Sequence, residues 1–268
     1  MKSADEIRDL VREKYGRIAR QGGSGCGPDC CGDTLGGASF AESYQGLDGY
    51  LPEADLGLGC GIPTEYAGIR EGQTVVDLGS GAGNDVFVVR AIVGARGRVI
   101  GLDMVPDMVT AARQNAARLA YDNVTFLLGE IEDMPLEDAV ADVLVSNCVL
   151  NLVPDKRRAF AEIHRVLKPG GHFCVSDIVL EGELPAALRE AADVYAGCVA
   201  GALQKDEYLA AIAGAGFDQV SIRATRRVRL PDGLLVDLLG AAEAASFRES
   251  GFGVYSVTVV GFKPPAAS

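Results

Sequence analysis

The chain has 268 residues, of which 48% are hydrophobic and 23% charged, which is enough apolar material for one large globular domain. Its net charge of −12 means that the chain has no excess of positive charge with which to neutralise phosphates. This argues against nucleic acids and anionic membranes as partners. No apolar run reaches the roughly 18 residues that suggest a membrane-spanning helix. The charged start, Met1 to Asp9, does not resemble a secretory signal. We therefore expect a cytoplasmic protein whose seven cysteines are mostly reduced.

The N-terminal part of the chain falls into two stretches of different composition. In residues 1–20, apolar residues alternate with charged ones at the spacing of an amphipathic helix. Residues 21–49 are rich in Gly and Ser, poor in aliphatic residues, and contain three cysteines, Cys26, Cys30 and Cys31. This composition predicts a mobile segment or lid.

From residue 74 onward, apolar strands alternate with amphipathic helices. The expected strands are residues 74–79, 98–104, 123–129, 141–152 and 172–179, with helices at 84–92, from Pro106, and at 155–167. The tail adds helices near 185–196 and 205–215, a strand at 219–228, a helix near 234–246 and a strand at 254–263. This alternation is typical of an α/β fold whose parallel sheet is covered by helices on both faces.

A glycine-rich turn follows the first buried strand, in the sequence VVDLGSGAGND at residues 75–85. Gly79, Gly81 and Gly83 let the backbone approach a ligand closely, because side chains would block that approach. Such a turn alone is a weak signal, and a dinucleotide is the first ligand to consider.

Acidic residues around this turn favour a cationic ligand instead. Asp77, two residues before the first glycine, would repel a pyrophosphate but can meet the cationic amino-acid part of a cofactor. Asp103 ends the second strand, where a carboxylate can accept hydrogen bonds from both ribose hydroxyls. Residues 129–135 follow the third strand and can hold an adenine edge through Glu130 and the amide of Ile131.

Together these motifs resemble the class I S-adenosylmethionine methyltransferases over roughly residues 60–180. The resemblance implies a Rossmann-like, mostly parallel sheet whose last strand is antiparallel. Met104 and Met108 line the adenine pocket in this interpretation, although ordinary packing explains them equally well. Asn147 either contacts the methionine part of the cofactor or caps a strand. The expected S-adenosylmethionine-binding residues are Asp77, Gly79, Ser80, Gly81, Gly83, Asp103, Met104, Met108, Glu130, Ile131 and Asn147.

The acceptor site offers thiols rather than a general base. The two histidines, His164 and His172, lie in a charged helix and at the start of a buried strand, where structural roles are expected. Cys148 ends the fourth strand, where open α/β sheets bind ligands. Cys198 follows the fifth strand and Cys60 precedes the cofactor turn. Thiolates select soft, thiophilic centres, and three of them would form a pyramidal cage.

The contexts of these cysteines resemble the arsenite methyltransferases over about residues 10–230. The matching segments are DLGLGCG-P at 55–63, SNCVLNL at 146–152, DIV at 177–179, YAGCVAGAL at 195–203, KYG-IA at 14–19 and the adjacent pair Cys30–Cys31. The resemblance implies that Cys60, Cys148 and Cys198 hold trivalent arsenic, whose lone pair attacks the sulfonium methyl without a base. It also implies a role in arsenic detoxification, with glutathione or thioredoxin to deliver and release the metalloid.

This interpretation divides the chain into an N-terminal helix and lid (1–59), a cofactor-binding domain (60–180) and C-terminal arsenic-site helices with closing strands (181–268). Two alternatives stay open: a methyltransferase for another small acceptor, such as a quinone precursor, and a metalloid-binding protein without turnover. Cys174, inside a strand, is expected in the core. The three N-terminal cysteines fit a second thiophilic site, an arsenic relay or a tolerated loop, and their spacing suits zinc poorly.

Overall fold

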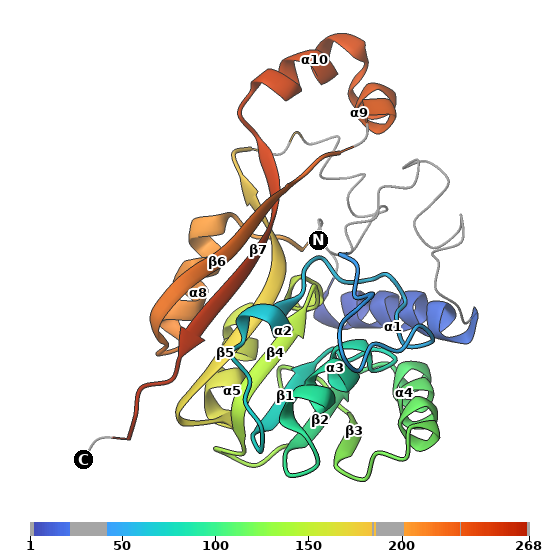
Figure 1. Ribbon diagram of the computed structural model, residues 1–268. Coiled ribbons are helices and arrows are strands. Elements are labelled where there is room, and N and C mark those ends of the chain that lie inside the picture. Colours follow the sequence, from blue (N-terminus) through green and yellow to red (C-terminus); the bar gives the residue numbers. More distant parts are fainter. Residues whose placement is uncertain (1–2, 22–41, 184, 186–200, 231, 267–268) are drawn as a thin grey trace.

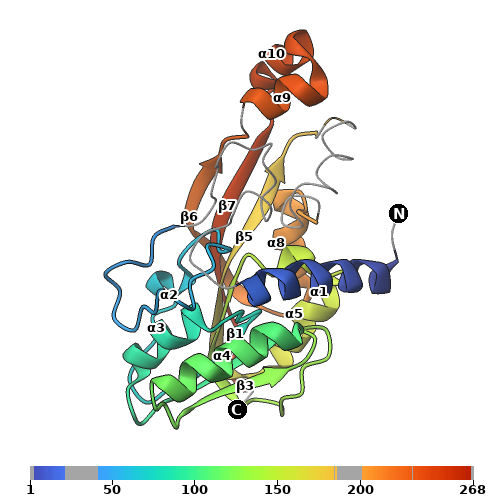
Figure 2. The same cartoon turned by 90° about the vertical axis from the view of Figure 1, so that its right-hand side faces the viewer.

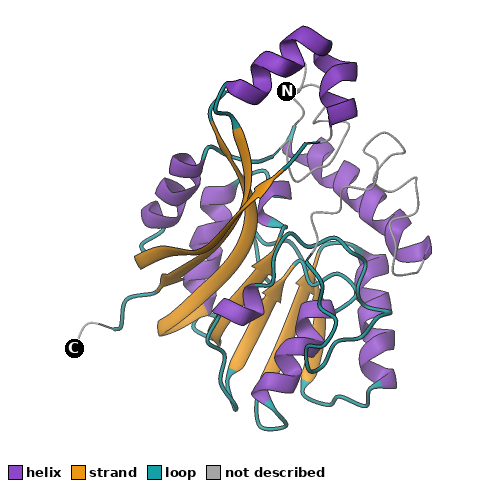
Figure 3. Cartoon of the chain, turned by 45° about the horizontal axis from the view of Figure 1, so that its top comes forward, coloured by secondary structure: helices purple, strands orange, loops and turns teal. Residues whose placement is uncertain are grey.

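The computed structural model describes residues 3–21, 42–183, 185, 201–230 and 232–266. The strands in these ranges form one seven-stranded sheet in the order β3-β2-β1-β4-β5-β7-β6 (Figures 1 and 3). They are β1 (Thr74–Leu78), β2 (Arg98–Asp103), β3 (Val124–Leu128), β4 (Ala141–Asn147), β5 (Leu167–Glu181), β6 (Asp218–Val228) and β7 (Gly253–Phe262). β1 to β5 pair in parallel, and β7 is antiparallel to both β5 and β6. The prediction of a mostly parallel Rossmann-like sheet with an antiparallel last strand is confirmed.

Helices cover both faces of the sheet, as expected for buried parallel strands. The described helices are α1 (Ala4–Gln21), α2 (Pro63–Tyr66), α3 (Asn84–Val93), α4 (Pro106–Arg118), the 3₁₀ turn η1 (Leu150–Leu152), α5 (Lys156–Val166), α8 (Lys205–Gly214), α9 (Asp232–Leu239) and α10 (Ala241–Glu249). Two of the apolar cores lie on these faces: one is between the sheet and α5 and α8, and one is between the sheet and α3, α4 and α1. α9 and α10 lie at the far end of the long β6–β7 ribbon (Figure 1).

Three local differences from the predicted elements have backbone causes. The fourth strand ends at Asn147 and not at residue 152, because Cys148 has φ +60° and turns the chain into η1. The single helix expected near 234–246 is two helices, since Gly240 has φ +77° and separates α9 from α10. The short helix α2 was not predicted; a proline opens it. The helix expected near 185–196 lies outside the described residues.

The residues assigned structural roles from the sequence are packed as expected. Cys174 is fully buried, its thiol donates to the Pro63 carbonyl (3.2 Å), and burial raises its pKa to about 12. His164 packs against Phe217 and His172 against Phe262. Among the residues that the structure describes, no helix is both long and apolar enough to cross a bilayer.

Candidate active site

A pocket opens at the carboxyl ends of β1, β2, β3 and β4, the edge where open α/β sheets bind ligands. Each loop that leaves one of these strands contributes to its wall, and α1 covers one side. Ten of the eleven predicted cofactor residues line it: Asp77, Gly79, Ser80, Gly81, Asp103, Met104, Met108, Glu130, Ile131 and Asn147. The eleventh, Gly83, lies just outside, against the Phe87 ring, where an added Cβ would come within 2.8 Å of a ring carbon.

The glycine turn after β1 presents bare backbone to this pocket. Gly79 (φ +67°) leaves no room for a side chain, since a Cβ there would lie 2.3 Å from Val149. Gly81 (φ +52°) differs, because its Cβ would point into open space, 4.0 Å from the nearest atom, Sδ of Met108. The Gly81 amide donates to Oδ2 of Asp103 (2.9 Å). The turn and the end of β2 are therefore fixed to each other, with an open approach above Gly81.

Three buried carboxylates surround the base of the pocket. Burial raises the pKa of Asp77 well above its usual value, with smaller contributions from Asp85 and Asp103. Burial also raises the pKa of Asp85 to about 6, against hydrogen bonds from Tyr44 and Asn147. Carboxylates buried together favour a cationic ligand and oppose a pyrophosphate.

Asn147, at the end of β4, joins the pocket to the segment that carries Cys60. Its Oδ1 accepts from the amides of Cys60 (3.0 Å) and Gly61 (3.3 Å). Its Nδ2 donates to the Gly61 carbonyl (2.7 Å) and the Tyr44 hydroxyl (2.8 Å), which itself donates to Oδ1 of Asp85 (2.8 Å). Asn147 therefore ties Cys60 to the carboxylate-lined base, a connection that neither sequence interpretation of this residue anticipated.

Cys60 and Cys148 are both buried and belong to one apolar cluster, which also contains Ile178 and Phe252. The Cys60 carbonyl accepts from Oγ of Ser256 (2.6 Å), so β7 also holds this segment. The strand end carrying Cys148 is fixed to β5, because its amide donates to the Ser176 carbonyl (2.7 Å). Cys198, Cys26, Cys30 and Cys31 lie outside the described residues.

Comparison with known proteins places this site in a family. Residues 69–216 match the family described as a methyltransferase domain. The chain is 43% identical over 230 residues to an arsenite methyltransferase of Halobacterium salinarum, covering 81% of this chain and 59% of that protein. It is 36% identical over 252 residues to an arsenite methyltransferase of Aquipseudomonas alcaligenes, covering 90% and 71%. The chain belongs to the arsenite methyltransferase family.

A solved structure agrees with this assignment. The crystal structure of an arsenic(III) S-adenosylmethionine methyltransferase from Chlamydomonas reinhardtii matches with a TM-score of 0.67 and 33% identity, covering 86% of this chain and 74% of that one. The chain thus spans 59% to 74% of the length of these three relatives.

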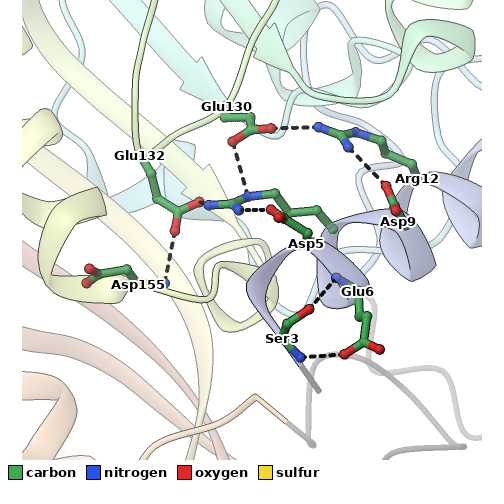
Figure 4. A network of polar contacts seen from close by, with 9 residues as sticks. Ser3, Asp5, Glu6, Asp9, Arg12, Glu130, Glu132 and Asp155 are labelled. Atoms are coloured by element: carbon green, nitrogen blue, oxygen red, sulfur yellow. Dashed lines mark hydrogen bonds and ion pairs between the residues drawn. The ribbon is translucent and has the colours of Figure 1, made fainter. Parts of the chain in front are cut away.

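In this member of the arsenite methyltransferase family, ion pairs hold α1 against the pocket wall that contains Glu130 and Glu132. Nη2 of Arg12 lies 2.6 Å from Oε1 of Glu130. Figure 4 shows Arg12 pointing at Glu130, with Glu132 nearby. Arg8 bridges the two glutamates, with Nε 3.1 Å from Glu130 and Nη2 3.1 Å from Glu132. Figure 2 shows α1 running across α4, where Arg20 also pairs with Asp107. α1 and the loop after β3 therefore form one wall.

We expect Arg8→Ala to raise the Kd for S-adenosylmethionine about three- to tenfold, or about 0.6–1.4 kcal/mol. Without the guanidinium, Glu130 and Glu132 repel each other and α1 loses its attachment to the pocket wall. Calorimetric titration at two salt concentrations measures this, and the difference between the two proteins should shrink at the higher concentration, because salt screens the ion pairs of Arg8. Arg17→Ala is the control, because Arg17 pairs with Glu13 within α1 itself. If the Arg8 variant binds S-adenosylmethionine with wild-type affinity, α1 does not contribute to the binding site.

Asp103→Ala should weaken S-adenosylmethionine binding by a few kcal/mol, because two charge-assisted hydrogen bonds of roughly 1.5–3 kcal/mol each are expected to the ribose. In the structure this buried carboxylate already accepts from the amides of Gly81 and Val105 (2.8 Å). Asp142→Ala is the control, since that carboxylate lies at the opposite end of β4. Calorimetry that finds equal affinity in the two variants would contradict the ribose assignment.

Tyr44 and Asp85 are among the polar pocket residues that the sequence interpretation missed. Asp85 stands in the first turn of α3, directly after the glycine turn, and could have been noticed there. Tyr44 carries no such signal, because it comes from the Gly/Ser-rich stretch and reaches Asp85 only through the tertiary fold.

Proposed function

We propose that this protein transfers a methyl group from S-adenosylmethionine to trivalent arsenic, as arsenite or methylarsenite, held by thiolates of Cys60, Cys148 and Cys198. The observation that carries the proposal is the pair Cys60 and Cys148, buried together beside a pocket lined with carboxylates. The names of the relatives agree with this acceptor.

The donor site follows from the charges and the open backbone of the pocket. When bound, S-adenosylmethionine supplies a methyl group on a cationic sulfur. Asp77 and Asp85 offer negative charge for the cationic part, and Asp103 offers a carboxylate for the ribose. We expect Glu130 and the amide of Ile131 to hold the adenine edge, and the ion pairs of Glu130 with Arg8 and Arg12 support this role by fixing its carboxylate.

The acceptor needs no base for the methyl transfer itself. Arsenic held by thiolates has a lone pair and no proton to lose, so the protein has only to align donor and acceptor. Asn147 supports that alignment, because it fixes the Cys60 segment and contacts the Tyr44–Asp85 pair at the donor site. External thiols, glutathione or thioredoxin, deliver arsenic and assist its release, and the cell gains protection from arsenite.

The test is incubation of the purified protein with arsenite, S-adenosylmethionine and glutathione, followed by arsenic speciation and assay of S-adenosylhomocysteine. Methylated arsenic with matching S-adenosylhomocysteine is the expected result. Tight arsenite binding without S-adenosylhomocysteine would instead identify a metalloid-binding protein. Methyl transfer to a quinone precursor but never to arsenic would identify a methyltransferase with another acceptor.

A further inference from the structure

Tyr44 places one hydroxyl group between the donor pocket and the segment that carries Cys60. The Tyr44 side chain is buried and lines the pocket. Its hydroxyl donates to Oδ1 of Asp85 (2.8 Å), in the first turn of α3, and accepts from Nδ2 of Asn147 (2.8 Å). The Gly61 carbonyl is a second acceptor within its reach, at 3.3 Å. The hydroxyl therefore has one proton and two acceptors, one in the donor pocket and one beside Cys60.

Asn147 continues this chain of hydrogen bonds to the backbone around Cys60. Its Oδ1 accepts from the Cys60 and Gly61 amides, and its Nδ2 also donates to the Gly61 carbonyl (2.7 Å). The backbone lies so close to this amide group that a Cβ at Gly59 would come within 2.5 Å of Nδ2. The Asn147 side chain and the Cys60 backbone therefore cannot shift independently of each other.

The Cys60 carbonyl is held from the other side, by the antiparallel ribbon. It accepts from Oγ of Ser256 in β7 (2.6 Å) and from Nη2 of Arg226 in β6 (3.1 Å). The Cys60 amide is instead bonded to Asn147, which Tyr44 joins to the donor pocket. The position of Cys60 therefore depends on both the ribbon and the donor pocket.

Asp85 is the member of this chain that a cationic ligand would meet. It is buried, and it lines the base of the pocket together with Asp77. A carboxylate has enough lone pairs to accept from the Tyr44 hydroxyl and to face a cation at the same time. A cation bound here fixes the Asp85 carboxylate, and so directs the Tyr44 proton toward Asp85 and away from Gly61. The Tyr44 oxygen is then free to accept from Asn147, which completes the chain to Cys60.

We propose that Tyr44 couples the two substrates, so that S-adenosylmethionine and trivalent arsenic each bind more tightly when the other is in place. A ligand that has already ordered Asp85, Tyr44 and Asn147 lowers the entropic cost of ordering Cys60 for the second ligand. By linkage, the factor is the same in both directions. Tyr44 acts through Asp85 and Asn147, and is therefore a positioning residue. The inference rests on the proposed function, because it takes Cys60 as an arsenic ligand.

The test is calorimetric titration of the full chain with sinefungin, with and without saturating arsenite and without added thiols. Sinefungin carries an amine in place of the methylsulfonium group, so it offers a positive charge but transfers no methyl group. In the wild type, arsenite should lower the Kd for sinefungin about tenfold, which is within the usual range of coupling between two sites. In Tyr44→Phe this ratio of Kd values should fall below about two. Because the ratio compares two Kd values of one protein, a general loss of affinity does not change it.

The substitution removes the hydroxyl and keeps the packing, because the Tyr44 ring lies in an apolar cluster with Ile62 and Val88. Tyr50→Phe is the matched control. Tyr50 comes from the same segment, packs against the same cluster and donates its hydroxyl to Asp55 (3.2 Å). In the described part of the chain, however, Tyr50 is not among the residues that line the pocket. Tyr50→Phe should keep the wild-type ratio.

Methylation of arsenite, assayed on the same preparations, separates failure of the coupling from failure of the proposed function. If the wild type methylates arsenite but its Kd for sinefungin does not respond to arsenite, the coupling is overturned and the proposed function stands. A wild-type ratio in Tyr44→Phe would overturn the role of Tyr44 in the same way. If arsenite tightens sinefungin binding equally in Cys148→Ser, it acts from another site, which would overturn both the coupling and the proposed arsenic ligands.

Discussion

Gly81→Val should abolish measurable binding of S-adenosylmethionine and all turnover. The native residue has φ +52° and leaves open space where a side chain would stand, at the top of the turn after β1. A valine there fills the approach of the ligand to the backbone, and it strains a conformation that β-branched residues rarely adopt. The same residue donates its amide to Asp103, so the variant also disturbs the expected ribose contact. Calorimetric titration with S-adenosylmethionine measures the loss.

Gly68→Val separates loss of the ligand site from backbone strain. Gly68 has a nearly equal φ of +57°, equally open surroundings, and no place in the pocket wall. Its variant should lose stability to a similar degree but bind S-adenosylmethionine as the wild type does. If Gly81→Val binds within a factor of two of Gly68→Val, the cofactor lies elsewhere.

The sheet, and the gathering of acidic residues around one pocket, could be predicted because their determinants are local in the sequence. The strand at β1 is a short run of buried residues that ends in a glycine turn, and a helix follows directly. Parallel strands bring their carboxyl ends to one edge, so acidic residues at several strand ends were expected to meet. The structure places Asp77, Asp103 and Glu130 around one pocket. Glu130 also forms ion pairs with two arginines of α1, and no local sequence pattern predicted these contacts.

What could not be predicted depends on contacts between distant segments. Asn147 bonds to residues more than 80 positions away, and nothing in SNCVLNL indicates that it fixes the Cys60 segment. The turn at Cys148 was predicted as strand, because its apolar neighbours have strong strand propensity. Nothing in these residues indicates the positive φ of Cys148. Asp177 was noticed only inside a motif, since its pairing with Tyr208 appears only when α8 packs on β5.

The thiols carry the prediction that distinguishes arsenic from other acceptors. Cys148→Ser and Cys198→Ser should abolish methylation of both arsenite and methylarsenite, because the proposed function makes these two cysteines the permanent ligands of arsenic. Cys60→Ser should lose activity on arsenite but keep it on methylarsenite. In methylarsenite one position on arsenic is already occupied by carbon, so two thiolates suffice. A serine oxygen is a hard ligand and cannot replace a soft one.

Cys174→Ser is the matched control, because Cys174 is as deeply buried as Cys60 but belongs to the core with α3, α4 and α1, where its thiol donates to the Pro63 carbonyl. It should lower stability and leave the ratio of the two activities unchanged. All four variants are assayed on each substrate under excess glutathione, with calorimetry to show that S-adenosylmethionine still binds. Cys60 is anchored through its backbone, by Asn147 and Ser256, so serine there should remove the thiol without moving the segment. Full activity of Cys148→Ser or Cys198→Ser on arsenite would reject arsenic as the acceptor and leave a methyltransferase for another small molecule.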